Sequence, residues 1–567
     1  IMGTVLGYLR PHGVRVACGV TVKFTAALLE LVLPLLLEHI VDVSVPAQDL
    51  TAIWVCGGIM AALAFGAAFC NITANRMAAW VSMEVTRKLR GDLYNRTQRL
   101  SCAQMDRFST SSLVSRLTND TYNVHQMFDK VQRGGIRAPM LVLGGLVLTF
   151  LLEPALAAVQ LAVSLLTFLT IWQVTRRGIP HYAAAQEAGD TVVRIIRENA
   201  SGVRVVKALA CQGRERQRFG EASEAARRAE ETAGCVMAAA NPLTDLLLNT
   251  GLVLVVLVGA LRVNAGQMPP GQIVAFLSYF TLIQTATLGI AKVFIRISKG
   301  AASARRIEEI LLEPADQPLR PSEAASEAEL GMDGVSFSYL GVERDLADVT
   351  FSLGRGETLG ILGPTGSGKS TLAALLMRLY DAGEGVVWAG GRDVNAVPRE
   401  ERRFGVVFQN EALLNDSVYE NISFLRNIPR EDVIAAAKTA QAWDFIQALP
   451  EGLDSRLDIR GANLSGGQRQ RLLAARALAG KPAVLVLDSA DSALDYATAA
   501  ALRAAIRRDC PGVTLVVISE RVASLRRADR ILVLEDGRVT AQGTHEELLE
   551  HCARYRHIAE LQRGVLL

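Results

Sequence analysis

A glycine-rich octapeptide near the middle of the chain has the residue types that hold a polyphosphate. It reads GPTGSGKS and occupies residues 363–370. Glycines let backbone N–H groups turn inward on phosphate oxygens, a lysine supplies a point charge, and a serine hydroxyl is a ligand for Mg²⁺. We therefore predict a nucleotide-binding loop made by Gly363, Pro364, Thr365, Gly366, Ser367, Gly368, Lys369, Ser370 and Thr371.

The segments on either side of this loop are those that a phosphate-binding loop needs. The apolar run Thr358–Leu362 predicts a buried strand, and the leucine spacing in Thr371–Tyr380 predicts a helix. In that order, the positive end of the helix dipole faces the phosphates. An accidental match of a Gly-rich turn is the alternative, with a chance of roughly a few per cent in a chain this long. The strand and helix around the loop argue against it.

Two more residues in this half have a chemistry of their own. Asp488 ends the apolar run Val484–Leu487, which is the usual pattern for an aspartate that supports a bound Mg²⁺. Tyr339 ends a predicted strand, Gly334–Tyr339, about 25 residues before the loop. Its ring could stack on a nucleotide base, and an ordinary edge aromatic is an equally good interpretation.

The chain as a whole is more apolar than an ordinary soluble enzyme. Half of the 567 residues are hydrophobic, and the mean hydropathy is +0.24. Six stretches are long enough to cross about 30 Å of hydrocarbon as helices. We place them at Val14–Ile40, Thr51–Thr73, Gly134–Leu152, Ala155–Thr175, Asn241–Val263 and Gly271–Ile295.

The connections between these stretches differ in charge. The long gaps Arg76–Arg137 and Arg176–Arg228 are rich in Lys and Arg, whereas the short gap Val41–Leu50 has neither. Because Lys and Arg keep loops in the cytoplasm, we expect the long gaps there, as helical extensions of the spans. Two unrelated helical insertions are the alternative. The net charge of +3 gives no indication of nucleic acid as a partner.

Several ionisable residues fall inside or at the ends of the predicted spans. They are Lys23, Glu30, Glu38, His39, Lys292 and Arg296. An ionisable group inside a membrane is a candidate for a transport pathway, and Glu30 is the deepest of these. The alternative is that they pair between helices or extend to the membrane surface.

A pentapeptide further along decides the family. Residues Leu464–Gln468 read LSGGQ. With the loop at 363–370 and the six spans, the chain resembles one half of an ATP-binding-cassette (ABC) transporter of the exporter type. The resemblance implies a multidomain membrane protein, with an all-α six-helix transmembrane domain and an α/β P-loop ATPase domain that carries a helical subdomain. We predict domains at 1–312 and 330–567, joined by an acidic, proline-containing linker at 313–329.

The resemblance also implies cofactors and residue roles. ATP and Mg²⁺ are the expected cofactors, with Tyr339 on the adenine and Mg²⁺ near Ser370, Gln409 and Asp488. Two such domains sandwich two ATP molecules, so this chain's LSGGQ would serve the ATP bound to its partner, through Ser465, Gly466, Gly467 and Gln468. The stretches Leu113–Asp120 and Glu198–Phe219 resemble the two loops that dock on the nucleotide-binding domains.

Three positions depart from the family's pattern. The glutamate that polarises the attacking water is Ser489 here, and the switch histidine is Glu520. A serine hydroxyl is no base at neutral pH, and general-base help is worth roughly 10²–10⁴-fold. A carboxylate that faces a γ-phosphate is repulsive. The segment Ser455–Gly461 before LSGGQ also differs. Asp491 or Glu520 acting as a shifted base is the alternative.

These departures predict a site that binds MgATP and hydrolyses it poorly. We expect the half of a heterodimer in the cytoplasmic (inner) membrane of a bacterium, with a partner half that keeps both the glutamate and the histidine. The expected activity is ATP-dependent efflux of a small or amphipathic solute through the lipid bilayer. The alternatives are an ATP-gated regulatory subunit and an exporter-fold transporter for thiols or siderophores. Six spans argue against an ATPase that acts on nucleic acid.

Overall fold

The computed structural model describes residues 3–314, 318–320, 322, 326–398, 401–409 and 411–564. The chain forms two compact units. The first contains Ile1–Gln98 and Thr110–Glu313, and the second contains Arg99–Ser109 and Pro314–Leu567. The predicted domain boundaries at 312 and 330 stay predictions, because part of the predicted linker, with Pro321, lies outside the described residues.

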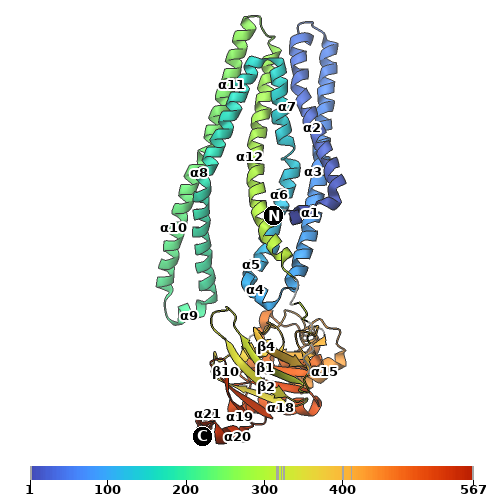
Figure 1. The fold of residues 1–567 in the computed structure, drawn as a ribbon. Coiled ribbons are helices and arrows are strands. Elements are labelled where there is room, and N and C mark those ends of the chain that lie inside the picture. The colour runs from blue at the N-terminus through green and yellow to red at the C-terminus, as the bar shows by residue number, and fades with distance from the viewer. Residues whose placement is uncertain are drawn as a thin grey trace. The chain divides into compact units, whose positions relative to one another are not determined.

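The first unit is entirely helical where the structure describes it (Figure 1). Long helices alternate with short ones or with tight turns. In chain order the elements are α1 (Gly3–Gly7), η1 (Arg10–His12), α2 (Gly13–His39), η2 (Ile40–Ser44), α3 (Leu50–Gln98), α5 (Thr110–Ser115), η3 (Arg116–Asp120), α6 (Thr121–Arg133), α7 (Arg137–Leu152), α8 (Pro154–Ser201), α9 (Val203–Ala208), α10 (Gln212–Ala238), α11 (Ala240–Asn264) and α12 (Gly271–Leu312).

Six helical segments of the described chain are long and apolar enough to span a membrane, as predicted. Each of the six predicted spans lies within one of them. The helices continue well past the spans: α3 has 49 residues and α8 has 48. The prediction that the basic gaps are helical extensions of the spans is therefore confirmed for these helices.

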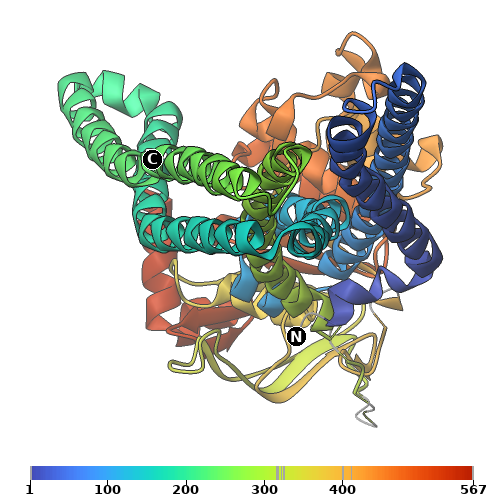
Figure 2. The same cartoon turned by 90° about the horizontal axis from the view of Figure 1, so that it is seen from above.

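Helix α12 is packed on two sides by apolar residues from different helices. One cluster joins it to α2 and α7 through residues such as Leu31, Leu141 and Tyr279. The other joins it to α8 and α11, where Phe280 packs with Val163. Seen from above, α8 and α11 run beside each other (Figure 2). This close approach depends on a glycine of α11: a Cβ atom at residue 251 would overlap the Phe280 ring and lie 3.0 Å from Val163 Cγ1.

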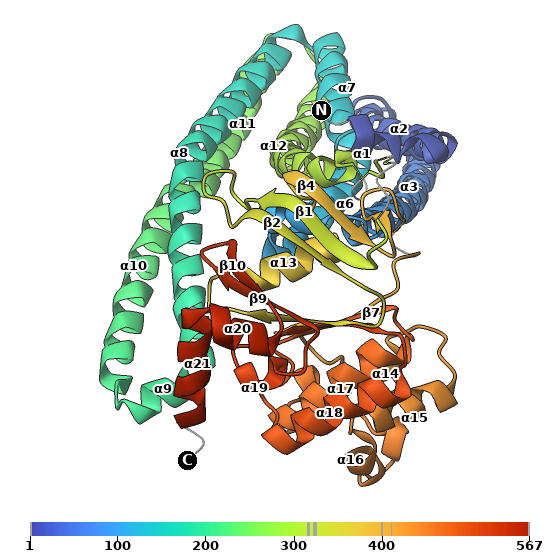
Figure 3. The same cartoon turned by 60° about the horizontal axis from the view of Figure 1, so that its bottom comes forward.

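The second unit contains two sheets and a set of helices (Figure 3). The antiparallel sheet has the order β2-β1-β4-β5, and the larger sheet has the order β10-β9-β3-β8-β7-β6. The strands are β1 (Leu330–Phe337), β2 (Leu346–Leu353), β3 (Thr358–Leu362), β4 (Glu384–Ala389), β5 (Arg392–Asp393), β6 (Phe404–Val407), β7 (Val484–Asp488), β8 (Thr514–Ile518), β9 (Arg530–Glu535) and β10 (Arg538–Gly543).

The described helices of this unit lie before, between and after its strands in the chain. They are α4 (Cys102–Phe108), α13 (Lys369–Leu376), α14 (Val418–Ser423), α15 (Arg430–Thr439), α16 (Trp443–Gln447), α17 (Gly466–Ala479), α18 (Tyr496–Asp509), α19 (Val522–Leu525), α20 (His545–His551) and α21 (Ala553–Gly564), with short 3-10 turns at Gly452–Asp454 and Ile459–Gly461. Helices α14 to α17 fall between β6 and β7 in the chain, so they form the helical subdomain that the resemblance implies.

Strands β3, β6, β7 and β8 of the larger sheet are parallel and bring their carboxyl ends to one edge. The strand predicted at Thr358–Leu362 has those bounds in the structure. Two predicted bounds are wrong. The helix after the loop begins at Lys369 and ends at Leu376, because the loop's last residues already form its first turn. Strand β1 ends at Phe337, two residues before Tyr339.

The packing of α11 yields a stability prediction. Gly251→Ala places a methyl group on the Phe280 ring, and overpacking of this kind costs about 1–3 kcal/mol. We expect a lower apparent melting temperature of the full chain in detergent, measured by tryptophan fluorescence. Gly57→Ala in α3 is the matched control, since no described atom outside its own stretch of helix lies within 4 Å of its Cβ position. Equal melting temperatures for Gly251→Ala and the control would contradict the packing described.

Candidate nucleotide-binding site

The loop between β3 and α13 has a backbone conformation that only glycine adopts readily at two positions. Gly366 and Gly368 have φ values of +84° and +97°, a region that favours glycine. At Gly363 a Cβ atom would lie 2.5 Å from Ser367 Oγ, so a side chain there would displace the loop. Ser367 Oγ is buried and has no hydrogen-bond partner among the described protein atoms. The loop therefore has a buried hydroxyl donor without a partner among the described residues.

The lysine and serine of the loop hold defined positions. Lys369 is 8% exposed, and its Nζ donates to Gly363 O at 2.8 Å and to Pro364 O at 2.7 Å. Ser370 Oγ donates to Asp488 Oδ2 at 2.7 Å. Two of the three residues predicted near Mg²⁺ are thus in contact, one from the end of β7 and one from the start of α13. A hydroxyl and a carboxylate oxygen are suitable ligands for this ion.

Gln409, the third residue predicted near Mg²⁺, is not joined to this pair. It follows β6, is exposed, and shares no hydrogen bond with Ser370 or Asp488 among the described residues. Asn410, which follows it, lies outside the described residues. The next described residue, Glu411, forms an ion pair of 3.0 Å with Arg476 of α17. Because the Arg476 side chain is 7% exposed, this pair anchors the loop after β6 to the helical subdomain. Burial lowers the pKa of Arg476.

Tyr339 lies in an aromatic group beside the loop. Its ring meets Phe337 edge-on at 4.8 Å and Tyr380 edge-on at 5.1 Å between centroids. Its hydroxyl lies 3.4 Å from Thr371 Oγ1, and 45% of the residue is exposed. A half-exposed ring next to the phosphate loop has room to stack on a base. The prediction of base stacking by Tyr339 is compatible with this placement and stays a prediction.

Tyr380 connects this aromatic group to α4. Its hydroxyl donates to Asp106 Oδ2 at 2.6 Å. Burial, and then this hydrogen bond, raise the pKa of Tyr380 well above its usual value. The segment of the first basic gap that belongs to the second unit is therefore Arg99–Ser109. It precedes the predicted docking stretch Leu113–Asp120, which lies in the first unit.

The position after Asp488 has no base. Ser489 has a φ of +54°, and its Oγ donates to Asp488 Oδ1 at 3.4 Å. A hydroxyl at that position cannot accept the proton of an attacking water at neutral pH. The predicted lack of a base at this position stays a prediction.

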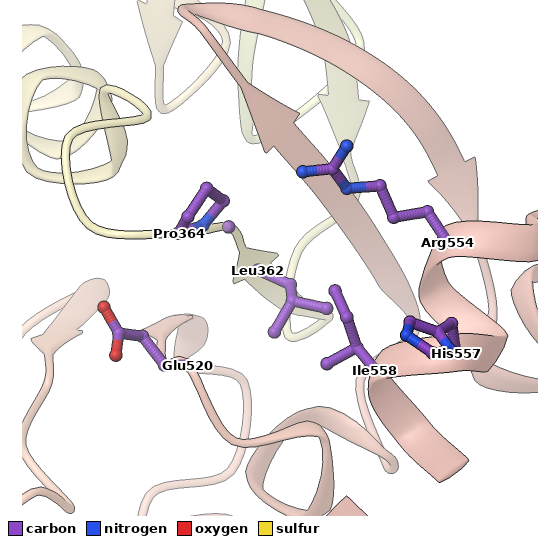
Figure 4. A pocket seen from close by; sticks show the side chains of 7 residues that line it. Leu362, Pro364, Glu520, Arg554, His557 and Ile558 are labelled. Carbon is purple, nitrogen blue, oxygen red and sulfur yellow. The ribbon is translucent and has the colours of Figure 1, made fainter. Parts of the chain in front are cut away.

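Glu520 faces the phosphate loop directly. Thr365 Oγ1 donates to its Oε1 at 2.9 Å, and Lys369 Nζ lies 3.7 Å from the same oxygen. Figure 4 shows Glu520 and Pro364 on the same side of a cavity of about 470 Å³. Side chains of α21 form the far wall of that cavity: Arg554, His557 and Ile558.

Asp491 is the other candidate for a shifted base, and its carboxylate oxygens already accept hydrogen bonds. It is 8% exposed and accepts hydrogen bonds from Ser519, at 3.3 Å, and from Ser524. Arg503 Nη1 lies 3.7 Å from its Oδ2. Burial lowers the pKa of Arg503, and the charge of Asp491 opposes that shift. The carboxylate thus ties the loop after β7 to the loop after β8, so the structure favours a positioning role.

The LSGGQ residues form the start of a 14-residue helix, α17. Ser465 Oγ accepts from Gln468 N at 3.2 Å, and Gln468 Oε1 accepts from Ser465 N at 2.9 Å. This capping box leaves Ser465 and Gly466 exposed at the positive end of the helix dipole. No hydrogen bond between the described residues joins LSGGQ to the phosphate loop of its own chain. The motif thus lies at an exposed, capped helix start.

Residues that the sequence did not indicate complete the site. Gln562 of α21 donates to Glu520 O at 2.8 Å and accepts from Val522 N at 2.8 Å. It therefore fixes the backbone after β8 from a helix about 40 residues away. No motif marks Gln562, Tyr380 or Asp106, because each acts only through a contact that folding creates.

The charged residues in the spans form a network between three helices. Lys23 Nζ donates to Asn71 Oδ1 at 2.7 Å and to Asn75 Oδ1 at 3.0 Å. Glu30 accepts from Asn71 Nδ2 at 2.9 Å and from Arg137 Nη2 at 2.6 Å. Lys23 and Glu30 are thus each bonded to polar residues of neighbouring helices. This favours the interpretation that they hold helices together over the interpretation that they contact cargo. Lys292 and Arg296 are exposed, and Glu38 is half-buried.

Comparisons with known proteins agree with this architecture. Residues 16–287 match the model of the ABC transporter transmembrane region, and residues 346–492 match the ABC transporter model. The uncharacterized ABC transporter ATP-binding protein YfiB of Bacillus subtilis is 34% identical over 99% of both chains. An ATP-dependent lipid A-core flippase of Albidiferax ferrireducens is 31% identical, covering 98% of this chain and 97% of its own.

A solved structure extends the similarity to the whole fold. A bacterial Atm1-family ABC exporter with ATP bound matches with a TM-score of 0.84 at 24% identity, over 98% of each chain. Six membrane helices and a P-loop domain define a multi-pass membrane protein that binds ATP. The chain belongs to the ABC transporter family. The predicted fold class is confirmed.

The environment of Asp491 yields a prediction that separates a structural role from a catalytic one. Asp491→Asn keeps the size of the side chain but removes the charge that two hydroxyls and Arg503 face. Loss of such a buried contact costs about 1–3 kcal/mol. We expect a lower melting temperature and an unchanged residual rate of ATP hydrolysis, both measured on the full chain. A loss of hydrolysis at unchanged stability would instead make Asp491 the base.

Proposed function

We propose that this chain is one half of a heterodimeric ABC exporter and that its own ATP site is impaired in hydrolysis. The observation that carries the proposal is the hydroxyl of Ser489, 3.4 Å from Asp488, at the position where the family has its base. The carboxylate of Glu520 beside Lys369 adds a second defect. ATP and Mg²⁺ would still bind, through the loop at 363–371 with Ser370 and Asp488.

The intact LSGGQ motif supports a division of labour between two halves. Ser465, Gly466 and Gly467 are presented at a capped helix end with no partner in their own phosphate loop. In the proposed heterodimer they complete the ATP site of the partner, with Gln468 holding the cap. Two copies of this chain would have a base at neither site, so a homodimer would turn over very slowly.

A second support is the segment formed by α8, α9 and α10. The part of α8 that leads into α9 runs beside α10 (Figure 1). The connection between them, α9, has no buried residue. Large apolar side chains stay exposed along this segment: Ile179, Tyr182, Val193, Ile196, Val203, Val205 and Leu209. These residues include part of Glu198–Phe219, predicted to dock on a nucleotide-binding domain. Apolar surface of this kind indicates a protein interface, and we assign it to the partner half.

The cargo is proposed as a small or amphipathic solute. Similar proteins include ATP-dependent lipid A-core flippases, whose named cargo is amphipathic. Movement is proposed out of the cytoplasm, across the cytoplasmic membrane of a bacterium, with the second unit in the cytosol. The direction of ATP-dependent uptake into inverted vesicles tests this, since an importer would not load them. A subunit that only gates or signals would move no labelled cargo in either orientation.

The proposed function predicts how the chain behaves on its own. Purified alone, it should bind ATP but show little Mg-dependent ATPase activity, because the base is absent. Co-expression with a homologous half that has both the glutamate and the histidine should restore the activity. In that complex, Ser465→Ala in this chain should lower the rate, since it removes a contact to the partner's γ-phosphate. Robust ATPase activity of this chain alone would refute the proposal.

The second prediction concerns the missing base. Ser489→Glu restores a carboxylate next to Asp488, yet Glu520 still faces the phosphates. We expect the variant alone to gain less than the roughly 10²–10⁴-fold that a general base contributes. The double change Ser489→Glu with Glu520→His should gain more. Phosphate release under single-turnover conditions measures both, and an equal rate for the two variants would remove Glu520 from the account.

A further inference from the structure

Glu520 occupies a place that matters for the choice of nucleotide. Its Oε1 accepts from Thr365 Oγ1 at 2.9 Å and lies 3.7 Å from Lys369 Nζ. In a phosphate-binding loop the lysine serves the β- and γ-phosphates. The Glu520 carboxylate therefore places a negative charge beside Lys369, the cation that a γ-phosphate would contact.

The main chain of Glu520 is held in this position. Gln562 donates to Glu520 O and accepts from Val522 N, both at 2.8 Å. Ser519 Oγ, one residue earlier, donates to the buried Asp491. Only the side chain of Glu520 is free to turn, so a γ-phosphate that arrives must either displace the carboxylate from Thr365 and Lys369 or bind next to it.

A diphosphate has no such conflict. ADP lacks the γ-phosphate, so its bound form can keep the carboxylate near the lysine, whereas ATP adds negative charge close to Glu520. Like charges a few ångströms apart repel strongly when solvent is scarce. The Glu520 side chain is 59% exposed, so water screens part of this repulsion.

We propose that Glu520 makes this phosphate loop select a nucleoside diphosphate over a triphosphate. The inference rests on the proposed function, because it deepens the account of the impaired site: that site holds ADP more tightly than ATP. Glu520 is then a specificity-determining residue.

The test measures two dissociation constants by titration calorimetry on the full-length chain in detergent. The probes are Mg-ADP and the Mg complex of AMP-PNP, a triphosphate that is not hydrolysed. The unchanged chain should bind ADP more tightly. Glu520→Gln should shift the ratio of the two constants about tenfold toward the triphosphate, since it removes one charge that solvent partly screens. Glu520→Ala should shift it in the same direction.

Glu431→Gln is the control, an exposed glutamate of α15 that is changed in the same way. It should leave the ratio as it is in the unchanged chain. A preference of the unchanged chain for AMP-PNP, or an unchanged ratio in both Glu520 variants, overturns the inference. If such a result is found together with low ATPase activity, the inference about Glu520 is overturned and the proposed function stands. High ATPase activity of the chain overturns the proposed function, while the ratio still decides the role of Glu520.

Discussion

The structure of the nucleotide site depends on one constraint, the parallel pairing of β3, β8 and β7. Their register places Ile361 opposite Ile518, and Ile518 opposite Asp488. Because the strands end at the same edge of the sheet, the three loops that follow them must share one space. The hydrogen bond from Ser370 to Asp488 and the contact of Glu520 with Lys369 are direct results of that register.

The sequence predicted the parts of this arrangement that depend on local pattern. The mostly apolar run Thr358–Leu362 locates β3 at its observed bounds, because a strand buried on both faces leaves little room for polar residues. The six spans were equally clear, since only long apolar helices satisfy their backbone in lipid. Ser370 and Asp488 were both identified from local pattern. Ser370 stands where the glycine-rich loop meets the following helix, and Asp488 ends an apolar run.

Contacts between distant segments could not be predicted in this way. The tie from Gln562 to the backbone of Glu520, and the network of Lys23, Asn71 and Glu30, depend on how elements pack and not on any spacing in the chain. The role of Asp491 is similar. Its residue type suggested a base, and only its burial against Ser519 and Ser524 shows that its oxygens are already engaged.

Helix α4 has a consequence for how the two units are connected. The chain enters the second unit at Arg99, leaves it after Ser109, and enters it again at Pro314. Three covalent crossings therefore join the units, and one of the included segments is bonded to Tyr380 in the aromatic group of Tyr339. The ends of α3, α5 and α12 are therefore covalently continuous with the second unit. A protein cut at 313 would lose α4, and with it the acceptor of the Tyr380 hydroxyl.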